Sequence, residues 1–130
     1  MFNGRCEMVN VIKRNKFGQV KPKRNFSTVF DANWKKLDVS LNGNFPPINL
    51  PEKPENLAEM LEVAHELAQS IDYVRVDLYN IHSRIVFGEL TSYPQAGQNT
   101  YHFEPYSQPD KKKSLAFDNY LGSKLVLDKY

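Results

Sequence analysis

Two carboxylates, Asp77 and Glu89, are the residues of this 130-residue chain whose type and spacing could do chemistry together. If they face each other across two strands, their like charges repel by roughly 0.2–1 kcal/mol when exposed, and by more when water is excluded. The simplest relief is a salt bridge from the neighbouring Arg75. The alternatives are a proton shared by the two acids and a hard divalent cation such as Mg²⁺, which prefers oxygen ligands. The residue pattern leaves all three open.

A β-hairpin is the element that must position these acids. Apolar and polar residues alternate over residues 73–79, which is the period of a half-buried strand. Residues 84–90 are rich in β-branched and aromatic side chains and are a second predicted strand, with the turn at residues 80–83. The two strands therefore form an antiparallel pair with one apolar face and one charged face.

The register of this hairpin decides which side chains meet. We expect Tyr79 to pair with Phe87. Since side chains two residues apart share a face, this register places the two acids opposite each other and Arg75 opposite Thr91. The sequence thus predicts a cluster of one cation, two carboxylates and one hydroxyl on a single face.

The motifs around the acids resemble a known family. "RVDLYN", "FGELT" and "YPQAG" resemble the C-terminal metal-binding segment of ATP-grasp ligases, in which an Arg-x-Asp strand is followed by Glu-x-Asn and a Pro/Gly loop. The resemblance is closer to the TupA-like ATP-grasp family, associated with teichuronopeptide and other cell-surface polysaccharide synthesis, where Thr replaces that Asn. "KPENLAEMLEVAHELAQSIDYVRVDLYN" and "RIVFGELTSYP" follow the family's order, and "FNGRCEMVNVIKRNKFG" and "LGSKLVL" are similar to its flanking segments. The resemblance covers nearly the whole chain.

The resemblance implies a role for each residue of the cluster. Asp77 and Glu89 correspond to ligands of one or two Mg²⁺ ions that bridge to the phosphates of ATP, and Thr91 stands at the third ligand position. Arg75 corresponds to a catalytic residue facing the phosphates or an acyl-phosphate intermediate. Thr91 is a weaker ligand than the usual amide, although a hydroxyl can hold a metal-bound water.

The activity implied by the resemblance is carboxylate–amine ligation. ATP would activate a carboxylate as an acyl phosphate, which is then joined to an amine, and the sequence names neither substrate. Where the family often has a glycine-rich run after the proline, this chain has "PQAGQN". That departure leaves the positioning of the substrate open.

The start of the chain indicates that residues 1–130 are one domain of a larger ligase. Asn3-Gly4 is a strong signal for a tight hairpin turn, yet only two residues precede it. The following strand, residues 5–12, would then lack its partner and expose an edge. We interpret the chain as the C-terminal part of an ATP-grasp enzyme without its N-terminal nucleotide-binding half. Such a part should not catalyse the reaction alone, because phosphoryl transfer needs several positioned groups.

The remaining elements predict an α+β fold, mainly an antiparallel sheet with one main helix packed on it. Residues 55–69 carry an apolar stripe at helical spacing, formed by Leu57, Met60, Leu61, Ala64, Leu67 and Ala68. Residues 91–113 are rich in turn formers and aromatics and are predicted to be irregular, with solvated lysines at their end. "FDNYLGSKLVL" is expected to form a short helix or turn and a closing segment.

Composition favours a cytoplasmic chain. Hydrophobic residues make up 41% and charged residues 25%, which is typical of a globular domain. The single Cys6 excludes a disulfide framework, and a reducing compartment is the default for an unpaired thiol. No stretch approaches the roughly 20 apolar residues that span a bilayer. The sequence therefore predicts no membrane span.

Charge distribution supports an alternative class of function. Residues 1–24 carry one acid, Glu7, against seven basic side chains: Arg5, Lys13, Arg14, Lys16, Lys21, Lys23 and Arg24. A nucleic-acid-binding module could use such an arm to follow phosphates. No known nucleic-acid motif accompanies these basic residues. We therefore rank two hypotheses, nucleic-acid binding and a non-catalytic remnant of a ligase, below the interpretation as the C-terminal part of a ligase. Lysines on a solvated strand edge explain most of these residues.

Overall fold

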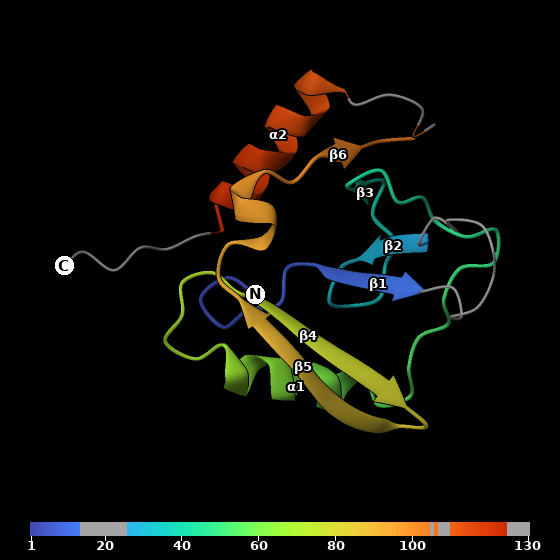
Figure 1. The fold of residues 1–130 in the computed structure, drawn as a ribbon, viewed down its shortest axis with the longest axis vertical. Coiled ribbons are helices and arrows are strands. Elements are labelled where there is room, and N and C mark those ends of the chain that lie inside the picture. The colour runs from blue at the N-terminus through green and yellow to red at the C-terminus, as the bar shows by residue number, and fades with distance from the viewer. Residues whose placement is uncertain (14–25, 105, 107–109, 125–130) are drawn as a thin grey trace.

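The computed structural model describes residues 1–13, 26–104, 106 and 110–124, and these residues form an α+β fold (Figure 1). Its antiparallel strands confirm the predicted class. In chain order the elements are β1 (Val9–Lys13), β2 (Phe26–Phe30), β3 (Ser40–Leu41), α1 (Leu57–Leu67), β4 (Arg75–Ile81), β5 (Arg84–Thr91), the 3₁₀ turn η1 (Pro94–Gly97), β6 (Tyr101–His102) and α2 (Lys111–Gly122). The sequence predicts one mainly antiparallel sheet. Within the described residues the strands instead form three separate two-stranded antiparallel sheets, β1–β2, β3–β6 and β4–β5.

The β4–β5 hairpin closes through a two-residue loop. His82 and Ser83 both have positive φ, of 50° and 63°, and Ile81 pairs with Arg84 on either side of them. Two positive φ values are the geometry of a type I′ turn, whose twist matches that of the strands. The turn is therefore shorter than the predicted residues 80–83. β4 begins and ends two residues later than the predicted residues 73–79, and β5 ends one residue later than the predicted residues 84–90.

The register of the hairpin agrees with the prediction at the site and differs beyond it. Asp77 pairs with Glu89, and Arg75 lies opposite Thr91 as expected. Tyr79, however, pairs with Val86 and not with Phe87, because a bulge shifts the register between Asp77 and Leu78. The predicted pairing of Tyr79 with Phe87 is wrong, since the extra residue on β5 moves each later pair by one position.

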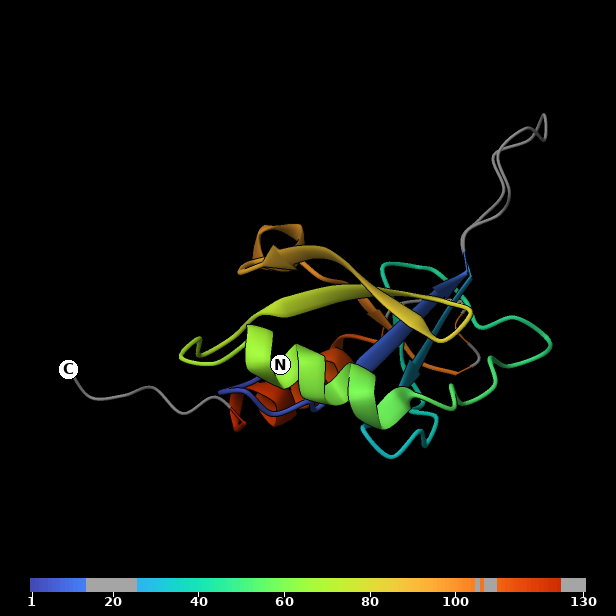
Figure 2. The ribbon, with the colours of Figure 1, turned by 90° about the horizontal axis from the view of Figure 1, so that it is seen from below.

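Helix α1 supports the hairpin from one side. Figure 2 shows α1 running along β4, and the two elements are in contact. Leu57 and Ala64 of the predicted stripe are buried within the helix, and Ala68, which caps its C-terminal end, is fully buried. The helix begins and ends two residues inside the predicted residues 55–69. It packs an apolar face on the sheet as the stripe predicts.

The first residues of the chain join the hairpin. Asn3 and Gly4 form the predicted tight turn with φ of 47° and 74°, and Phe2 and Arg5 exchange backbone hydrogen bonds across it. The N-terminal amine donates to the Val74 carbonyl at 2.9 Å. The backbone before the turn thus continues the pairing of the strand that carries the site.

The strand after this turn is shorter than predicted and has a partner. β1 begins at Val9, not at residue 5, and pairs along its whole length with β2. Part of the predicted strand therefore has a partner, because β2, from later in the chain, covers one edge of β1. Within the described residues its other edge is unpaired, as expected. Five of the seven basic residues named for the alternative nucleic-acid-binding arm lie outside the described residues, namely Arg14, Lys16, Lys21, Lys23 and Arg24, and so does the closing segment after Lys124.

The main core gathers residues from both halves of the chain. Val29, Val39, Leu41 and Tyr101 are buried together. Partly buried side chains pack around them, namely Met8, Leu37, Phe103, Phe117 and Leu121. Two of these come from α2, so the second helix closes this core from above the β3–β6 pair, as Figure 1 shows.

Helix α2 begins earlier than the sequence indicated. Asp110 caps it by accepting a hydrogen bond from the Lys113 N–H at 2.9 Å. Lys111, Lys112 and Lys113 are exposed as predicted, but they form its first turn and do not belong to an irregular segment. No helix in the described part of the chain is long and apolar enough to cross a membrane.

A pH dependence follows from the buried Tyr101. Burial raises the pKa of its hydroxyl from 10.0 to about 12, and the Asp118 carboxylate and its hydrogen bond act in the same direction. Because the folded state holds this proton more tightly, the contribution is complete below about pH 10 and is lost between about pH 10 and pH 12. As the pH rises through this range, we expect the free energy of unfolding to fall less for Tyr101→Phe than for the native chain. Denaturant unfolding at stepped pH checks this, and parallel decline in both proteins would contradict it.

Candidate functional site

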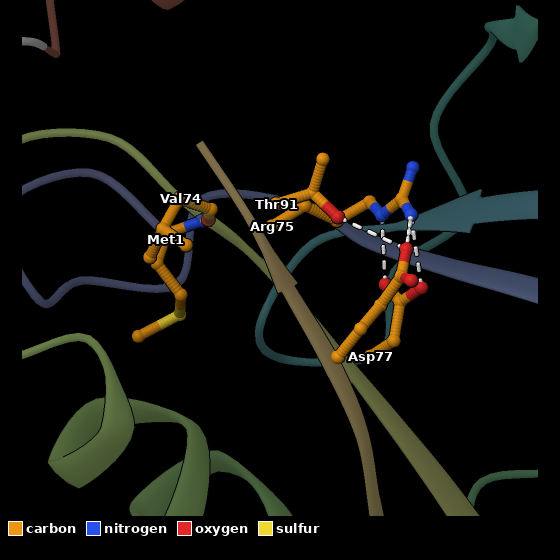
Figure 3. Close-up of polar contacts among 6 residues, drawn as sticks. Met1, Val74, Arg75, Asp77 and Thr91 are labelled. Atoms are coloured by element: carbon orange, nitrogen blue, oxygen red, sulfur yellow. Dashed lines mark hydrogen bonds and ion pairs between the residues drawn. The ribbon is translucent and has the colours of Figure 1, made fainter. Parts of the chain in front are cut away.

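Arg75 bridges the two carboxylates on the charged face of the hairpin. Its Nε donates to Asp77 Oδ1 at 2.8 Å and its Nη2 to Asp77 Oδ2 at 3.0 Å. The same Nη2 donates to Glu89 Oε1 at 2.5 Å. Figure 3 shows the Arg75 side chain leaving β4 and reaching the Asp77 carboxylate on the same side of the sheet. One guanidinium therefore binds two acids from two strands.

Thr91 completes the cluster from β5. Its Oγ1 donates to Glu89 Oε1 at 3.0 Å, so this oxygen accepts from both Thr91 and Arg75. The four residues that the sequence predicted to share a face are thus linked by hydrogen bonds. Alternation of side chains along each strand accounts for this, because residues 75 and 77 share a face of β4, and residues 89 and 91 share a face of β5.

The cluster lies at the surface, which limits its contribution to stability. The side chains of Arg75, Asp77 and Glu89 are 41%, 37% and 59% exposed. Burial tends to lower the pKa of Arg75, but its hydrogen bonds and charge attraction to Asp77 and Glu89 prevail and raise it, so the guanidinium stays charged. Ion pairs this exposed contribute about 0–1 kcal/mol each. The cluster is therefore easily rearranged by a ligand.

Three ways of reducing the repulsion between the facing carboxylates were predicted, and the structure shows one of them, the salt bridges from Arg75. In the described residues, this cluster included, no three His, Cys, Asp or Glu side chains gather in a group that could hold a metal ion. Two carboxylates and a hydroxyl are nevertheless oxygen donors of the kind that Mg²⁺ accepts, since it usually takes one or two carboxylates and completes its shell with water and phosphate. The guanidinium between the acids shows that their oxygens converge on one cation, so the donor set fits Mg²⁺.

Gly88 allows the close approach of β4 and β5 beside Asp77 and Glu89, and the sequence analysis did not identify this residue. It lies in β5 at the bulge, next to Glu89. A Cβ built there would lie 3.0 Å from the Asp77 carbonyl oxygen, 3.0 Å from a Tyr79 ring carbon and 3.3 Å from the Asp77 Cβ. The glycine therefore lets the two strands approach where the acids face each other. The signal in the sequence is an isolated glycine inside a strand pattern, which indicates a bulge or a close backbone approach.

The three histidines lie apart from this cluster. His65 Nδ1 is 2.8 Å from the Gly4 carbonyl and so ties α1 to the first turn. His82 is in the hairpin loop, and His102 is in β6 with its Nδ1 buried and unpartnered within the described structure. His65 is exposed on α1.

Comparison with known proteins gives one match. A family model described as "TupA-like ATPgrasp" matches residues 3–124, which is nearly the whole chain. Its span includes the hairpin and all four residues of the cluster. No curated protein and no solved structure matches the chain.

Proposed function

This chain belongs to the TupA-like ATP-grasp family, a family of ATP-binding, ligase-type proteins, and from that membership we propose that the hairpin cluster is its Mg²⁺-ATP phosphate site. The observation that supports the proposal is the convergence of Asp77 and Glu89 on one cation, the Arg75 guanidinium. Asp77, Glu89 and Thr91 would hold Mg²⁺. When bound, the ion neutralises charge on the phosphate oxygens during phosphoryl transfer.

Arg75 has two roles in this proposal. Without nucleotide it neutralises both acids through the three short contacts described above. With Mg²⁺ held by Asp77 and Glu89, Arg75 would be free to turn toward the phosphates or an acyl phosphate, which arginine binds through two parallel hydrogen bonds. Its exposure of 41% allows that movement without unpacking the core.

The proposed reaction joins a carboxylate to an amine. ATP would phosphorylate the carboxylate, and the amine would then displace phosphate from the acyl phosphate. From the resemblance of the hairpin motifs we also propose a role in the synthesis of teichuronopeptide or another cell-surface polysaccharide. We place the reaction in the cytoplasm, where ATP is available and an unpaired thiol such as Cys6 stays reduced.

A second ATP-grasp part would have to complete this site. The cluster is on the open face of a two-stranded hairpin, and Glu89 is 59% exposed. Phosphoryl transfer depends on enclosure and on several charged groups acting at once. We therefore propose that a nucleotide-binding ATP-grasp part covers the hairpin, and that catalysis needs both.

Metal binding tests the site directly in the chain as it stands. With Mn²⁺ in place of Mg²⁺, Asp77→Asn and Glu89→Gln should each lower affinity by roughly tenfold or more, as losses around metal sites do. Arg75→Ala should raise affinity, because the guanidinium competes for the same oxygens. Calorimetric titration, supported by Mn²⁺ electron paramagnetic resonance, measures these changes.

Two exposed residues serve as controls for charge. Glu62→Gln on α1 and Arg84→Ala beside the hairpin loop change net charge as the test variants do, but they leave the cluster intact. Both should bind Mn²⁺ like the native chain. An equal Mn²⁺ response in all variants would overturn the assignment of Asp77 and Glu89 as ligands.

A further inference from the structure

A hollow of about 300 Å³ lies in a part of the molecule separate from the hairpin cluster. Four segments line it: the residues before β1, the loop after β2, the residues after β6, and α2, which Figure 1 shows above the β3–β6 pair. Its polar lining is acidic and its apolar lining is largely aromatic, namely Glu7, Asp31, Asp38, Phe103, Phe117 and Tyr120. Among the described residues that line it, none is basic and none belongs to the hairpin cluster.

Backbone hydrogen bonds hold two of the three acids in place. Asp31 Oδ1 accepts from the N–H groups of Asn33 at 2.9 Å and Lys35 at 2.8 Å. Asp38 Oδ1 accepts from the Glu104 N–H at 3.1 Å. These bonds fix the orientation of each carboxylate before any ligand arrives. A preorganised carboxylate binds a cation without a further ordering cost.

The aromatic wall of the hollow already contacts ammonium groups. The Lys124 Nζ lies 5.0 Å from the centre of the Tyr120 ring and 3.8 Å from Glu7 Oε2. The Lys113 Nζ lies 5.7 Å from the centre of the Phe103 ring. Both separations are within the range of cation–π attraction. These contacts show that the Phe103 and Tyr120 rings can meet an ammonium group, and neither lysine is among the residues that line the hollow.

We propose that this hollow binds a small organic cation, a primary ammonium group on a short apolar stem. The ammonium would lie at the carboxylates of Asp31 and Asp38, and the stem would lie against Phe117 and Tyr120. A metal ion is a poorer match, because the acids of the described structure do not gather closely enough to coordinate one. A volume of about 300 Å³ is at the lower end for ligand sites, which suits a small ligand.

Titration with n-pentylammonium chloride tests the proposal on the whole chain. Amide shifts followed by NMR should saturate and should centre on the residues that line the hollow, whereas 1-pentanol, with the same stem and no charge, should bind more weakly. Asp38→Asn keeps an oxygen that accepts from Glu104 and so preserves the fold. It should weaken binding by about threefold, as loss of a partly exposed charge contact does. Tyr120→Leu should weaken it similarly by removing the ring.

Two further variants make the outcome decisive. Glu62→Gln on α1 is the matched control and should leave pentylammonium affinity unchanged. Lys124→Met should raise the affinity, because it removes a competing ammonium from Glu7 and Tyr120. Equal binding of pentanol and pentylammonium, or no saturable binding by the native chain, would overturn the proposal. Binding by Lys124→Met alone would also overturn it, since Lys124 would then be the cation that the hollow holds.

Discussion

Glu89→Gln will abolish Mg²⁺-dependent ADP release when this chain is joined to the nucleotide-binding part of a TupA-like ATP-grasp protein. Glu89 accepts from both Arg75 and Thr91, so its replacement by a neutral amide removes one of the two carboxylates and weakens the contact of its oxygen with the Arg75 guanidinium. Since phosphoryl transfer depends on positioned charge, the loss of one carboxylate should bring ADP release down to background. A coupled assay of ADP with carboxylate and amine mixtures measures this.

The chain without that part should release no ADP, and Glu62→Gln in the fusion should release ADP at the native rate. Thermal melting of each protein shows whether inactivity reflects unfolding. Robust ADP release from the unfused chain would contradict the need for a second part. A folded fusion that releases no ADP would favour the alternative reading, that of a remnant which has kept the fold and lost the chemistry.

Gly88→Ala will destabilise the hairpin and disrupt the site together. A methyl group there would meet the Asp77 carbonyl oxygen and the Tyr79 ring at 3.0 Å, and the carbonyl belongs to a paired strand that cannot easily move. Overpacking of this kind costs about 1–3 kcal/mol. Relief requires β4 and β5 to separate next to Asp77 and Glu89, so we also expect weaker Mn²⁺ binding. Denaturant unfolding and Mn²⁺ titration measure the two effects.

Gly122→Ala is the matched control for this change. Gly122 ends α2, and a Cβ built there meets nothing within 4 Å. Alanine is the better helix former, so this variant should be as stable as the native chain or slightly more stable, with unchanged Mn²⁺ binding. A native-like Gly88→Ala would show that the bulge does not need glycine and that the acids are positioned by other contacts.

Local periodicity alone determined the elements that carry the site. Alternation in residues 73–79 and the apolar stripe of residues 55–69 are short-range patterns, and the hairpin and α1 form where those patterns lie. Placement of Arg75 and Asp77 on one face needs only the two-residue repeat of a strand. The tight turn at Asn3-Gly4 was also predictable, because few residues other than glycine and asparagine adopt positive φ without strain.

Long-range packing decided what the sequence pattern could not. The bulge at Gly88 depends on how closely β4 and β5 approach, and the pairing of β1 with β2 joins segments that no local pattern relates. The contacts of Arg75 with both acids depend on which rotamer the folded surface favours, and sequence spacing left a metal ion and a shared proton open as alternatives. The acidic hollow needs four separate segments to meet, so its charge and aromatic wall exist only once the tertiary structure has formed.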